Sequence, residues 1–248
     1  MREITSPANP LIIDLVKIRD DPKRRRRLNQ ILIEGVKLIE DIRALMPLLK
    51  VFSTKEKWLE AFAAEESYLI SDAVLKKITA TDNPEGVVAL VPMPSIPLPE
   101  KITRLLVLDR LQDPGNVGVL MRSAFALSWD AVFFLSGTAD PFNDKAVRAA
   151  KGATFRLPMV KGDFSKLQEI MSEHHLQLLA ADMHGEPLAQ GNVPDSHIAL
   201  ALGNEGAGLS KEMVDSALKV SIPMREGAES LNVASSGAIL MYELSGRA

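Results

Sequence analysis

The sequence predicts an α/β protein of two domains, and three of its features support this prediction. Short apolar runs alternate with amphipathic stretches along the chain, as strands alternate with helices in α/β layers. Four prolines lie within eight residues, at 92–99, where they exclude both a helix interior and a central strand. Polar, glycine-rich turns follow apolar runs in the second part of the chain. We therefore expect a domain at 1–91, a semi-rigid linker at 92–100 and a second domain at 101–248.

The first part predicts a small α/β layer structure. Asn9 and Pro10 mark the start of a helix, because Asn is a good N-cap and Pro is tolerated at the first helical position. The next elements are short runs bounded by turn residues. We expect strands at Gln30–Ile33, Lys50–Ser53, Tyr68–Ile70 and Gly86–Val91, and helices at Val36–Leu45, Lys55–Ala63 and Ala73–Ile78.

The second part predicts a parallel sheet. Its apolar runs are too short for helices, and turn residues bound them, which is typical of strands buried on both faces. These runs are Leu105–Leu108, Ala131–Leu135, Leu157–Val160, Leu176–Ala181, Ile198–Leu202 and Val220–Ile222. Helical stretches lie between them, and a last helix is expected at about 231–244. This pattern by itself predicts a doubly wound sheet.

Composition excludes several classes of protein. The chain has 248 residues, a formal net charge of −3 and no cysteine, so neither disulfides nor thiolate metal sites are possible. No window approaches the roughly 20 apolar residues that a membrane span needs. The four histidines, at 174, 175, 184 and 197, lack metal-ligand spacing. We expect a cytoplasmic protein without a metal site or a membrane segment.

Positive charge is concentrated near the N-terminus. Residues 1–27 carry eight Lys and Arg against four acids, and Arg24, Arg25, Arg26 and Arg27 are consecutive. Such a run suits a mobile arm that neutralises the phosphates of a nucleic acid. A solvated surface segment is the alternative.

Three polar turns are the strongest functional signal. They are Asp113-Pro114-Gly115-Asn116 with Arg122, Gly203-Asn204-Glu205-Gly206-Ala207-Gly208, and Glu229-Ser230-Leu231-Asn232. The carboxyl ends of parallel strands meet at one edge of a sheet, so these turns predict one ligand site. The order of the glycines at 203, 206 and 208 fits neither a dinucleotide fingerprint nor a P-loop, which disfavours NAD and ATP.

Together the turns resemble the three motifs of the SpoU (TrmH-like) family of RNA ribose 2′-O-methyltransferases, in the SPOUT superfamily. Asn116 and Arg122 keep the family's N-x-x-x-x-x-R spacing, and residues 202–208 and 222–232 match its second and third motifs. The resemblance implies a parallel sheet with a deep C-terminal trefoil knot, and S-adenosylmethionine as cofactor. It also implies a homodimer with the cofactor site near the subunit interface. The small residues at 234–238 of the last helix would allow such close packing.

The first domain carries a weaker resemblance to the same family. An Asn-Pro pair opens its first helix, and its first predicted strand ends in Glu34-Gly35, as in the family's accessory domain. This resemblance implies an L30e-like fold that binds the RNA substrate, and it favours ribosomal RNA over transfer RNA.

The resemblance assigns roles to individual residues. The catalytic set is Asn116, Arg122, Glu205, Ser230 and Asn232; the cofactor-binding set is Leu202, Gly203, Asn204, Gly206, Gly208, Ile222, Met224 and Leu231. Arg122 also belongs with the RNA-binding residues. Arginine is effectively always protonated, so phosphate clamping and support of a developing alkoxide fit it better than proton abstraction. Glu205 can orient Arg122 or accept the proton, and Asn116 and Ser230 can instead be helix caps.

Three other functions stay open at this point. One is a transfer RNA ribose methyltransferase, and another is a catalytically silent RNA-binding or assembly factor of the same fold. The intact polar set speaks against the silent factor. A Rossmann-type enzyme would require a fingerprint that the chain lacks.

Overall fold

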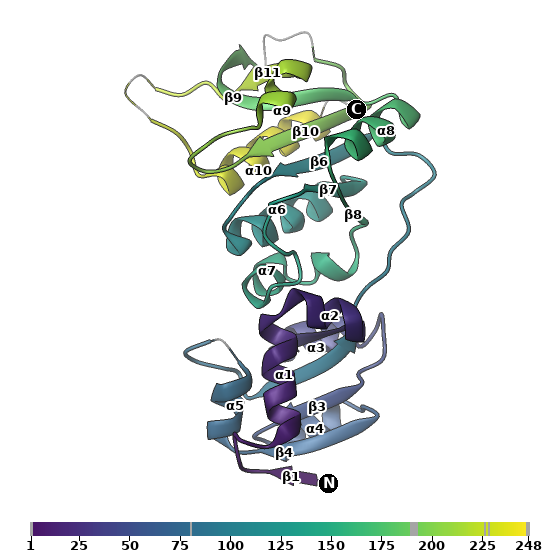
Figure 1. The fold of residues 1–248 in the computed structure, drawn as a ribbon, viewed down its shortest axis with the longest axis vertical. Helices are drawn as coiled ribbons and strands as arrows, with labels where there is room; N and C mark the ends of the chain where they lie inside the picture. Colours follow the sequence, from purple (N-terminus) through teal and green to yellow (C-terminus); the bar gives the residue numbers. More distant parts are fainter. Residues whose placement is uncertain (1, 80, 189–192, 226, 228, 247–248) are drawn as a thin grey trace. The chain divides into compact units, whose positions relative to one another are not determined.

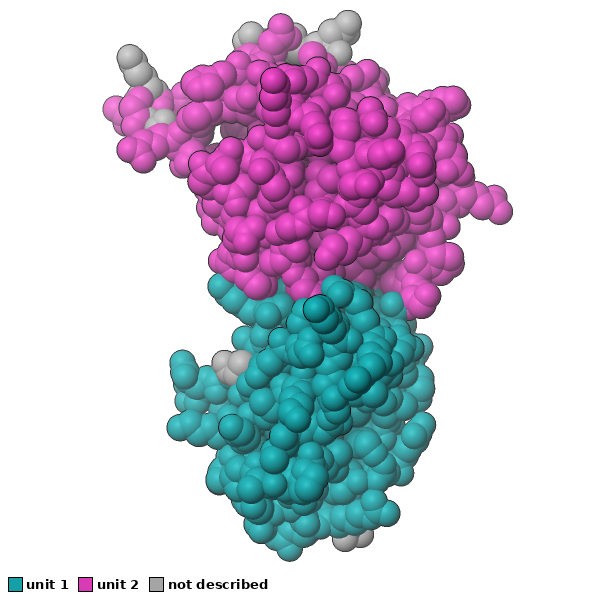
Figure 2. All heavy atoms as spheres, in the orientation of Figure 1, with its two compact units in different colours: residues 1–94, 142–155 teal, residues 95–141, 156–248 magenta. Residues whose placement is uncertain are grey.

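The computed structural model describes the chain apart from residues 1, 80, 189–192, 226, 228 and 247–248 (Figure 1). It divides into two compact units (Figure 2). Unit 1 comprises Met1–Pro94 and Phe142–Phe155, and unit 2 comprises Ser95–Pro141 and Arg156–Ala248. Segment 142–155 thus joins the unit formed by the first part of the chain. The boundaries at 91 and 101, which rest on the proline linker, stay a prediction.

Unit 1 is built on a mixed five-stranded sheet with the strand order β1-β4-β3-β5-β2. The strands are β1 (Arg2–Ile4), β2 (Gln30–Glu34), β3 (Lys50–Ser53), β4 (Glu66–Ile70) and β5 (Val87–Pro92). Strand β5 is antiparallel to β2 and β3, whereas β4 is parallel to β1 and β3. Four of these strands were expected from the sequence, and β1 was not.

The helices of unit 1 cover both faces of this sheet. They are α1 (Pro10–Asp20), α2 (Pro22–Leu28), α3 (Val36–Ile42), α4 (Glu56–Ala61), α5 (Asp72–Ile78) and α7 (Asp144–Ala150), followed by the 3-10 turn η1 (Ala153–Phe155). Side chains of α1 and α5 form one apolar cluster, and those of α3 and α4 form the other. Val147 and Phe155 belong to the second cluster, so segment 142–155 completes the core of unit 1.

The arginine run lies in a capped helix, and the expectation of a mobile arm is wrong. The side chain of Asp21 accepts a hydrogen bond from Lys23 N at the start of α2, and Asn29 ends the helix in a left-handed conformation. Arg25 is only 2% exposed, and its Nη1 donates to the carbonyls of Ile18 and Arg19. It therefore satisfies the last turn of α1, whose terminal carbonyls lack helical partners.

The other three arginines of α2 remain nearer the surface. Arg24 forms an ion pair with Asp14, and Arg26 and Arg27 are exposed. Only Arg24, Arg26 and Arg27 are therefore placed to meet a ligand.

Unit 2 is built on a six-stranded parallel sheet, as expected, with the order β11-β9-β10-β6-β7-β8. The strands are β6 (Arg104–Asp109), β7 (Ala131–Leu135), β8 (Met159–Gly162), β9 (Gln177–Pro187), β10 (Ile198–Gly203) and β11 (Leu218–Ser221). The first strand of the unit, β6, lies between β10 and β7. All six carboxyl ends meet at one edge, and the order along the chain reverses at β6–β10, where α/β sheets open a crevice.

Two pairs of helices cover the sheet of unit 2. One face packs on α8 (Phe164–Glu173) and α9 (Lys211–Ser216). The other packs on α6 (Pro114–Ala126) and α10 (Val233–Ser245), where Gly237 lets α10 approach closely. A Cβ at Gly237 would lie 2.3 Å from Leu120 Cδ2 and 2.5 Å from Leu202 Cδ1. This glycine therefore serves packing within the chain, and the subunit contact expected for residues 234–238 stays a prediction. Among the described helices, none has the length and apolar character of a membrane span.

Candidate active site

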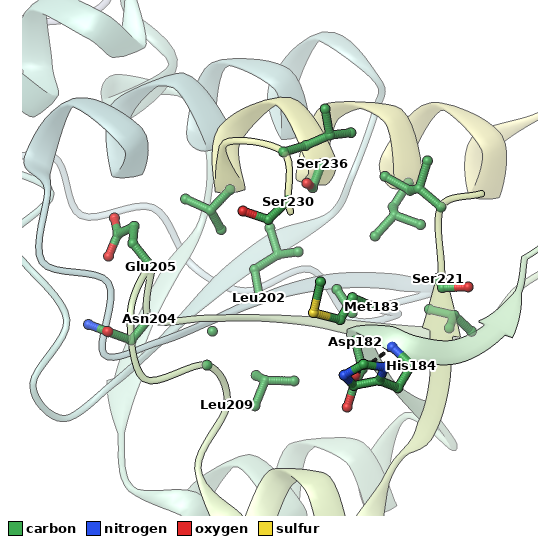
Figure 3. Close-up of a pocket in the computed structure, with 18 of the residues that line it drawn as sticks. Asp182, Met183, His184, Leu202, Asn204, Glu205, Leu209, Ser221, Ser230 and Ser236 are labelled. Atoms are coloured by element: carbon green, nitrogen blue, oxygen red, sulfur yellow. Dashed lines mark hydrogen bonds between the residues drawn. The ribbon is translucent and has the colours of Figure 1, made fainter. Parts of the chain in front are cut away.

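A cavity of about 620 Å³ opens at the carboxyl edge of the sheet in unit 2. Residues of β9, the segments after β10 and β11, and one side of α10 line it (Figure 3). The predicted site residues on its wall are Leu202, Gly203, Asn204, Glu205, Gly208, Ile222, Met224, Ser230, Leu231 and Asn232. The structure therefore brings the second and third turns to one cavity, while Asn116, Arg122 and Gly206 are not among its lining residues.

Asn116 is nevertheless joined to this site by hydrogen bonds. Its Nδ2 donates to Glu205 Oε1 at 3.0 Å, and its Oδ1 accepts from Asn232 Nδ2 at 3.3 Å. The first bond joins residues that are 89 positions apart in the sequence, and the second joins residues that are 116 positions apart. The three turns thus meet through one side chain of each.

The capping alternative for Asn116 and Ser230 is wrong. The cap of α6 is Asp113, whose carboxylate accepts from Gly115 N, and the cap of α10 is Asn232. Asn232 Oδ1 accepts from Ala234 N while its Nδ2 reaches Asn116. Capping and site contact therefore coexist in Asn232.

Glu205 is held as a carboxylate. Partial burial acts to raise its pKa, but the hydrogen bond from Asn116 and those from the backbone N–H groups of Glu205, Gln112 and Asp113 outweigh this effect. The pKa of Glu205 consequently lies below its ordinary value, which makes this carboxylate a weak proton acceptor. Within the described chain, these hydrogen bonds come from residues 112–116 and from the backbone of Glu205 itself, and none comes from Arg122.

Asn204 shapes the second turn. Its Oδ1 accepts from Gly206 N at 3.0 Å and Ala207 N at 2.8 Å, and its Nδ2 donates to Arg110 O at 2.9 Å. The backbone of Asn204 also pairs with that of Gly208, which has a φ of +69°. Gly206 and Gly208, both predicted to bind the cofactor, thus donate their N–H groups to Asn204, so this residue orders the loop.

Gly203 is required by the protein's own backbone. A Cβ there would lie 2.4 Å from Leu209 N and 2.5 Å from Gly208 C. The loop folds back on the end of β10 only because residue 203 lacks a side chain.

A buried carboxylate that the sequence analysis missed holds the other end of this loop. Asp109 is 1% exposed, and its Oδ2 accepts from Ser210 N at 2.6 Å. Its Oδ1 accepts from Arg110 Nε at 3.1 Å, and Arg110 has a positive φ of 59°. An acid at the end of the apolar run 105–108 was the available signal.

Arg122 lies outside the cavity. It is exposed on α6, on a surface that also carries the exposed side chains of Val119 and Phe125. In the part of the chain that the structure describes, its guanidinium has no hydrogen-bond or ion-pair partner. A ligand or a second protein copy can therefore reach it.

The cavity has a fourth wall that the sequence analysis also missed. Residues 181–184, Ala-Asp-Met-His, line it from β9. The signal was present, because this polar stretch with Gly185 follows the apolar run 176–181 as the other three turns follow theirs. Among the described residues, no group of three or more His, Cys, Asp or Glu could hold a metal ion.

Comparison with known proteins identifies the family. A family model described as the SpoU rRNA Methylase family matches residues 103–242. The chain belongs to this family. Residues 9–89 match a second model, the MRM3-like substrate binding domain. The resemblance expected from the three turns is thereby confirmed.

Similar SpoU proteins span nearly the whole chain. The 23S rRNA (guanosine(2553)-2′-O)-methyltransferase RlmP of Bacillus subtilis is 34% identical over 99% of this chain and 100% of its own. A solved RNA 2′-O ribose methyltransferase is 32% identical, covers 99% of this chain and 98% of its own, and has a TM-score of 0.82. The SpoU methyltransferase AviRb of Streptomyces viridochromogenes, solved with AdoMet, is 26% identical over 96% of this chain and 97% of its own, with a TM-score of 0.85.

Proposed function

We propose that this protein transfers a methyl group from S-adenosylmethionine to the 2′-hydroxyl of a ribose in ribosomal RNA. The observation that carries the proposal is the chain of bonds between Asn232, Asn116 and Glu205 at the rim of a cavity of about 620 Å³. Membership of the SpoU family and the AdoMet-bound relative support the activity and the cofactor.

The cavity fits such a cofactor. Its volume is within the range of about 300 to 1,000 Å³ that is usual for small-molecule sites. Leu202, Met224 and Leu231 offer apolar contacts for a nucleoside, and Asn204 orders the loop that lines the cavity beside them. When bound, S-adenosylmethionine supplies an electrophilic methyl group on a positively charged sulfur.

The chain's own residues position the acceptor ribose. Asn116 and Asn232 are fixed by their mutual bond and offer uncharged polar groups at the rim of the cavity. Glu205 stays ionised and orients Asn116, so we assign it positioning and electrostatic roles. Arg122 would clamp an RNA phosphate and support negative charge on the attacking oxygen, as preorganised cations do.

We further propose a homodimer that uses the surface of α6 and α10. Apolar patches of this kind mark interaction sites. Of the nine large apolar side chains exposed in the described chain, five lie on or next to these helices: Val119, Phe125, Leu231, Ile239 and Tyr242. Because Arg122 shares this surface, a second copy packed there would bring a cation close to a cofactor site.

Unit 1 would bind the RNA substrate. The match of residues 9–89 to the MRM3-like substrate binding domain supports this role, and we propose an L30e-like fold for residues 1–91. Arg24, Arg26 and Arg27 would contact phosphates, whereas Arg25 is already engaged in the protein. We also propose that unit 2 contains a deep trefoil knot, which its overlay on SpoU structures supports. The protein would meet such RNA in the cytoplasm, where we propose that it is located.

A methyl-transfer assay tests the function directly. Purified protein is incubated with methyl-labelled S-adenosylmethionine and, in separate reactions, with protein-free ribosomal RNA, ribosomal subunits or transfer RNA. We expect label in ribosomal RNA at a 2′-O-methyl nucleoside. Label in transfer RNA alone would favour a transfer RNA methyltransferase. Cofactor binding without transfer to any RNA would favour a catalytically silent RNA-binding factor.

A further inference from the structure

The charge of the cavity wall is one-sided. Among the described lining residues, Asp182 and Glu205 are acids, and none is lysine or arginine. Figure 3 shows the two acids at opposite ends of the cavity with Leu202 between them. A ligand that binds here lies against a wall that carries acids and, among its described residues, no lysine or arginine.

Asp182 belongs to an arch in β9. Ala180 pairs with Lys219 of β11, but the next pair along β11 is Val220 with Glu186, so residues 181–185 arch away from the ladder. Gly185 closes the arch, because a Cβ there would lie 2.7 Å from the backbone of Lys219 and Val220. The arch presents residues 181–184 to the cavity.

The two carboxylate oxygens of Asp182 have different roles. Oδ1 accepts from His184 N at 2.9 Å, which holds the arch. Oδ2 lies 3.8 Å from Lys219 Nζ, a loose ion pair with an exposed amine. Lys219 therefore offsets the charge of Asp182 only in part.

We propose that Asp182, together with Glu205, makes this cavity select for a positively charged nucleoside, so that it discriminates the sulfonium cofactor from its uncharged thioether product. The inference rests on the proposed function. S-adenosylmethionine carries a net charge of +1 near neutral pH, from a sulfonium, an ammonium and a carboxylate. Its demethylated product, S-adenosylhomocysteine, keeps only the last two and is neutral overall.

The consequence for turnover follows from this difference. Loss of the methyl group removes the sulfonium charge, which the acidic wall attracts, while the ammonium, the carboxylate and the apolar contacts stay the same. Asp182 thus lowers the affinity for the product relative to that for the cofactor. This difference favours replacement of the product by new cofactor after each methyl transfer. Asp182 is a specificity residue for the cofactor and takes no part in the transfer itself.

Calorimetry on the full chain tests the proposal with three ligands. These are S-adenosylmethionine, S-adenosylhomocysteine and sinefungin, an analogue with an amine cation in place of the methylated sulfur. The measured quantity is the Kd of the neutral ligand divided by the Kd of each cation. In Asp182→Asn this ratio should fall about fivefold, as expected for one partly screened charge near a ligand.

Two variants make the test specific. Lys219→Met removes the cation beside Asp182, so it should raise the ratio. Asp215→Asn removes an exposed acid of α9 that does not line the cavity, and it should leave the ratio unchanged within about twofold. Because the amide oxygen of Asn can still accept from His184 N, the arch keeps its bond in Asp182→Asn.

The outcomes separate the inference from the function on which it rests. An Asp182→Asn variant that weakens all three ligands equally, or none, overturns the charge selection and leaves Asp182 a purely structural part of the arch. A ratio that does not fall in wild type as salt is raised also contradicts it. Failure of all three ligands to bind folded wild-type protein would overturn the cofactor site, and with it the proposed function.

Discussion

Glu205 receives hydrogen bonds from two turns of the chain, and this arrangement determines its ionisation. Because its folded-state pKa lies below the ordinary value, the carboxylate form stabilises the fold above about pH 4.5, and this contribution is lost as pH falls through the folded-state pKa. The residue is therefore ionised throughout the range in which an RNA enzyme is assayed.

The pH dependence of the methylation rate tests the role of Glu205. In Glu205→Gln we expect a lower rate and weaker cofactor binding, but an unchanged shape of the profile between about pH 6 and 9, since no proton is exchanged by this group. Single-turnover rates at saturating RNA provide the measurement. A wild-type titration that disappears in Glu205→Gln would instead make Glu205 the base.

Arg122 should separate chemistry from cofactor binding. Its side chain lies outside the cavity, so Arg122→Ala should change S-adenosylmethionine affinity by no more than a few fold. The methylation rate should fall by a factor on the order of 10² or more, and Arg122→Lys should recover little, because a point charge does not replace a bidentate fork. Near-wild-type turnover of the Ala variant would remove Arg122 from catalysis.

Ten of the predicted site residues line the cavity, their roles stay predictions, and the sequence predicted few of their hydrogen-bond partners. Polar residues after apolar runs identified Asn116, Glu205 and Asn232, because parallel strands deliver their ends to one edge. The bonds that fix them depend on side-chain geometry across more than 80 residues, which local patterns do not contain. Asp109 and Asp182 were missed although each ends an apolar run.

In the loop after β10, Gly203 and Gly206 differ in the space that is available for a side chain. Gly203 faces backbone atoms at 2.4 to 2.5 Å, whereas the nearest atom to a Cβ at Gly206 is Asn204 Oδ1 at 3.8 Å. The fold thus requires glycine at position 203, whereas no close contact within the described chain requires it at position 206.

Alanine substitutions at these glycines should differ sharply. Gly203→Ala must displace the loop backbone, so it should abolish cofactor binding and lower the Tm. Gly206→Ala should leave the Tm unchanged, and any loss of affinity would then report contact with the ligand itself. Calorimetry and thermal melts decide this, and equal effects of the two substitutions on Tm would contradict the loop geometry.

Helix α2 carries arginines with two different roles. Arg26→Ala with Arg27→Ala should weaken RNA binding without a change in stability. On single-stranded RNA the salt dependence should flatten by roughly 0.7 log–log units for each phosphate that the variant no longer neutralises. Arg25→Ala should cost about 1 to 3 kcal/mol of stability, because it leaves carbonyls at the end of α1 without their charged donor. Affinity at several salt concentrations and denaturant melts test both statements; an unaltered salt slope would return Arg26 and Arg27 to a solvated surface.

Element prediction failed where short-range signals were weak or ambiguous. Four consecutive arginines suggested an arm, and the capping residues Asp21 and Asn29 on either side were the overlooked signs of a helix. Strand β1 has only three residues, too few for an alternating pattern. The predicted strand ended at Ala181, yet β9 continues beyond its arch to Pro187.

At the scale of the whole molecule, the chain order and the compact units do not coincide. The proline-rich segment lies between the two sheets along the chain, but residues 142–155 return to the core of unit 1 through Val147 and Phe155. Nothing local marks this return, because α7 is amphipathic like any surface helix.

A fragment of residues 95–248 should therefore still bind the cofactor, but it should be less stable than the full chain. Every described residue that lines the cavity lies between 181 and 240, so we expect S-adenosylmethionine to bind with an affinity near that of the full chain. The exposed Val147 and Phe155 should make the fragment prone to associate, and RNA methylation should be poor without unit 1. A folded fragment that does not bind the cofactor would contradict the assignment of the site to unit 2.

Mapping of ribose methylation in ribosomal RNA tests whether the protein methylates that RNA in cells. Total RNA is compared between cells with the gene intact, cells lacking it, and cells lacking it that express wild-type protein or Arg122→Ala. We expect one or a few 2′-O-methyl nucleotides in ribosomal RNA to vanish without the gene, to return with the wild-type protein and to stay absent with Arg122→Ala. An unchanged methylation map of ribosomal RNA in the deleted cells would contradict it.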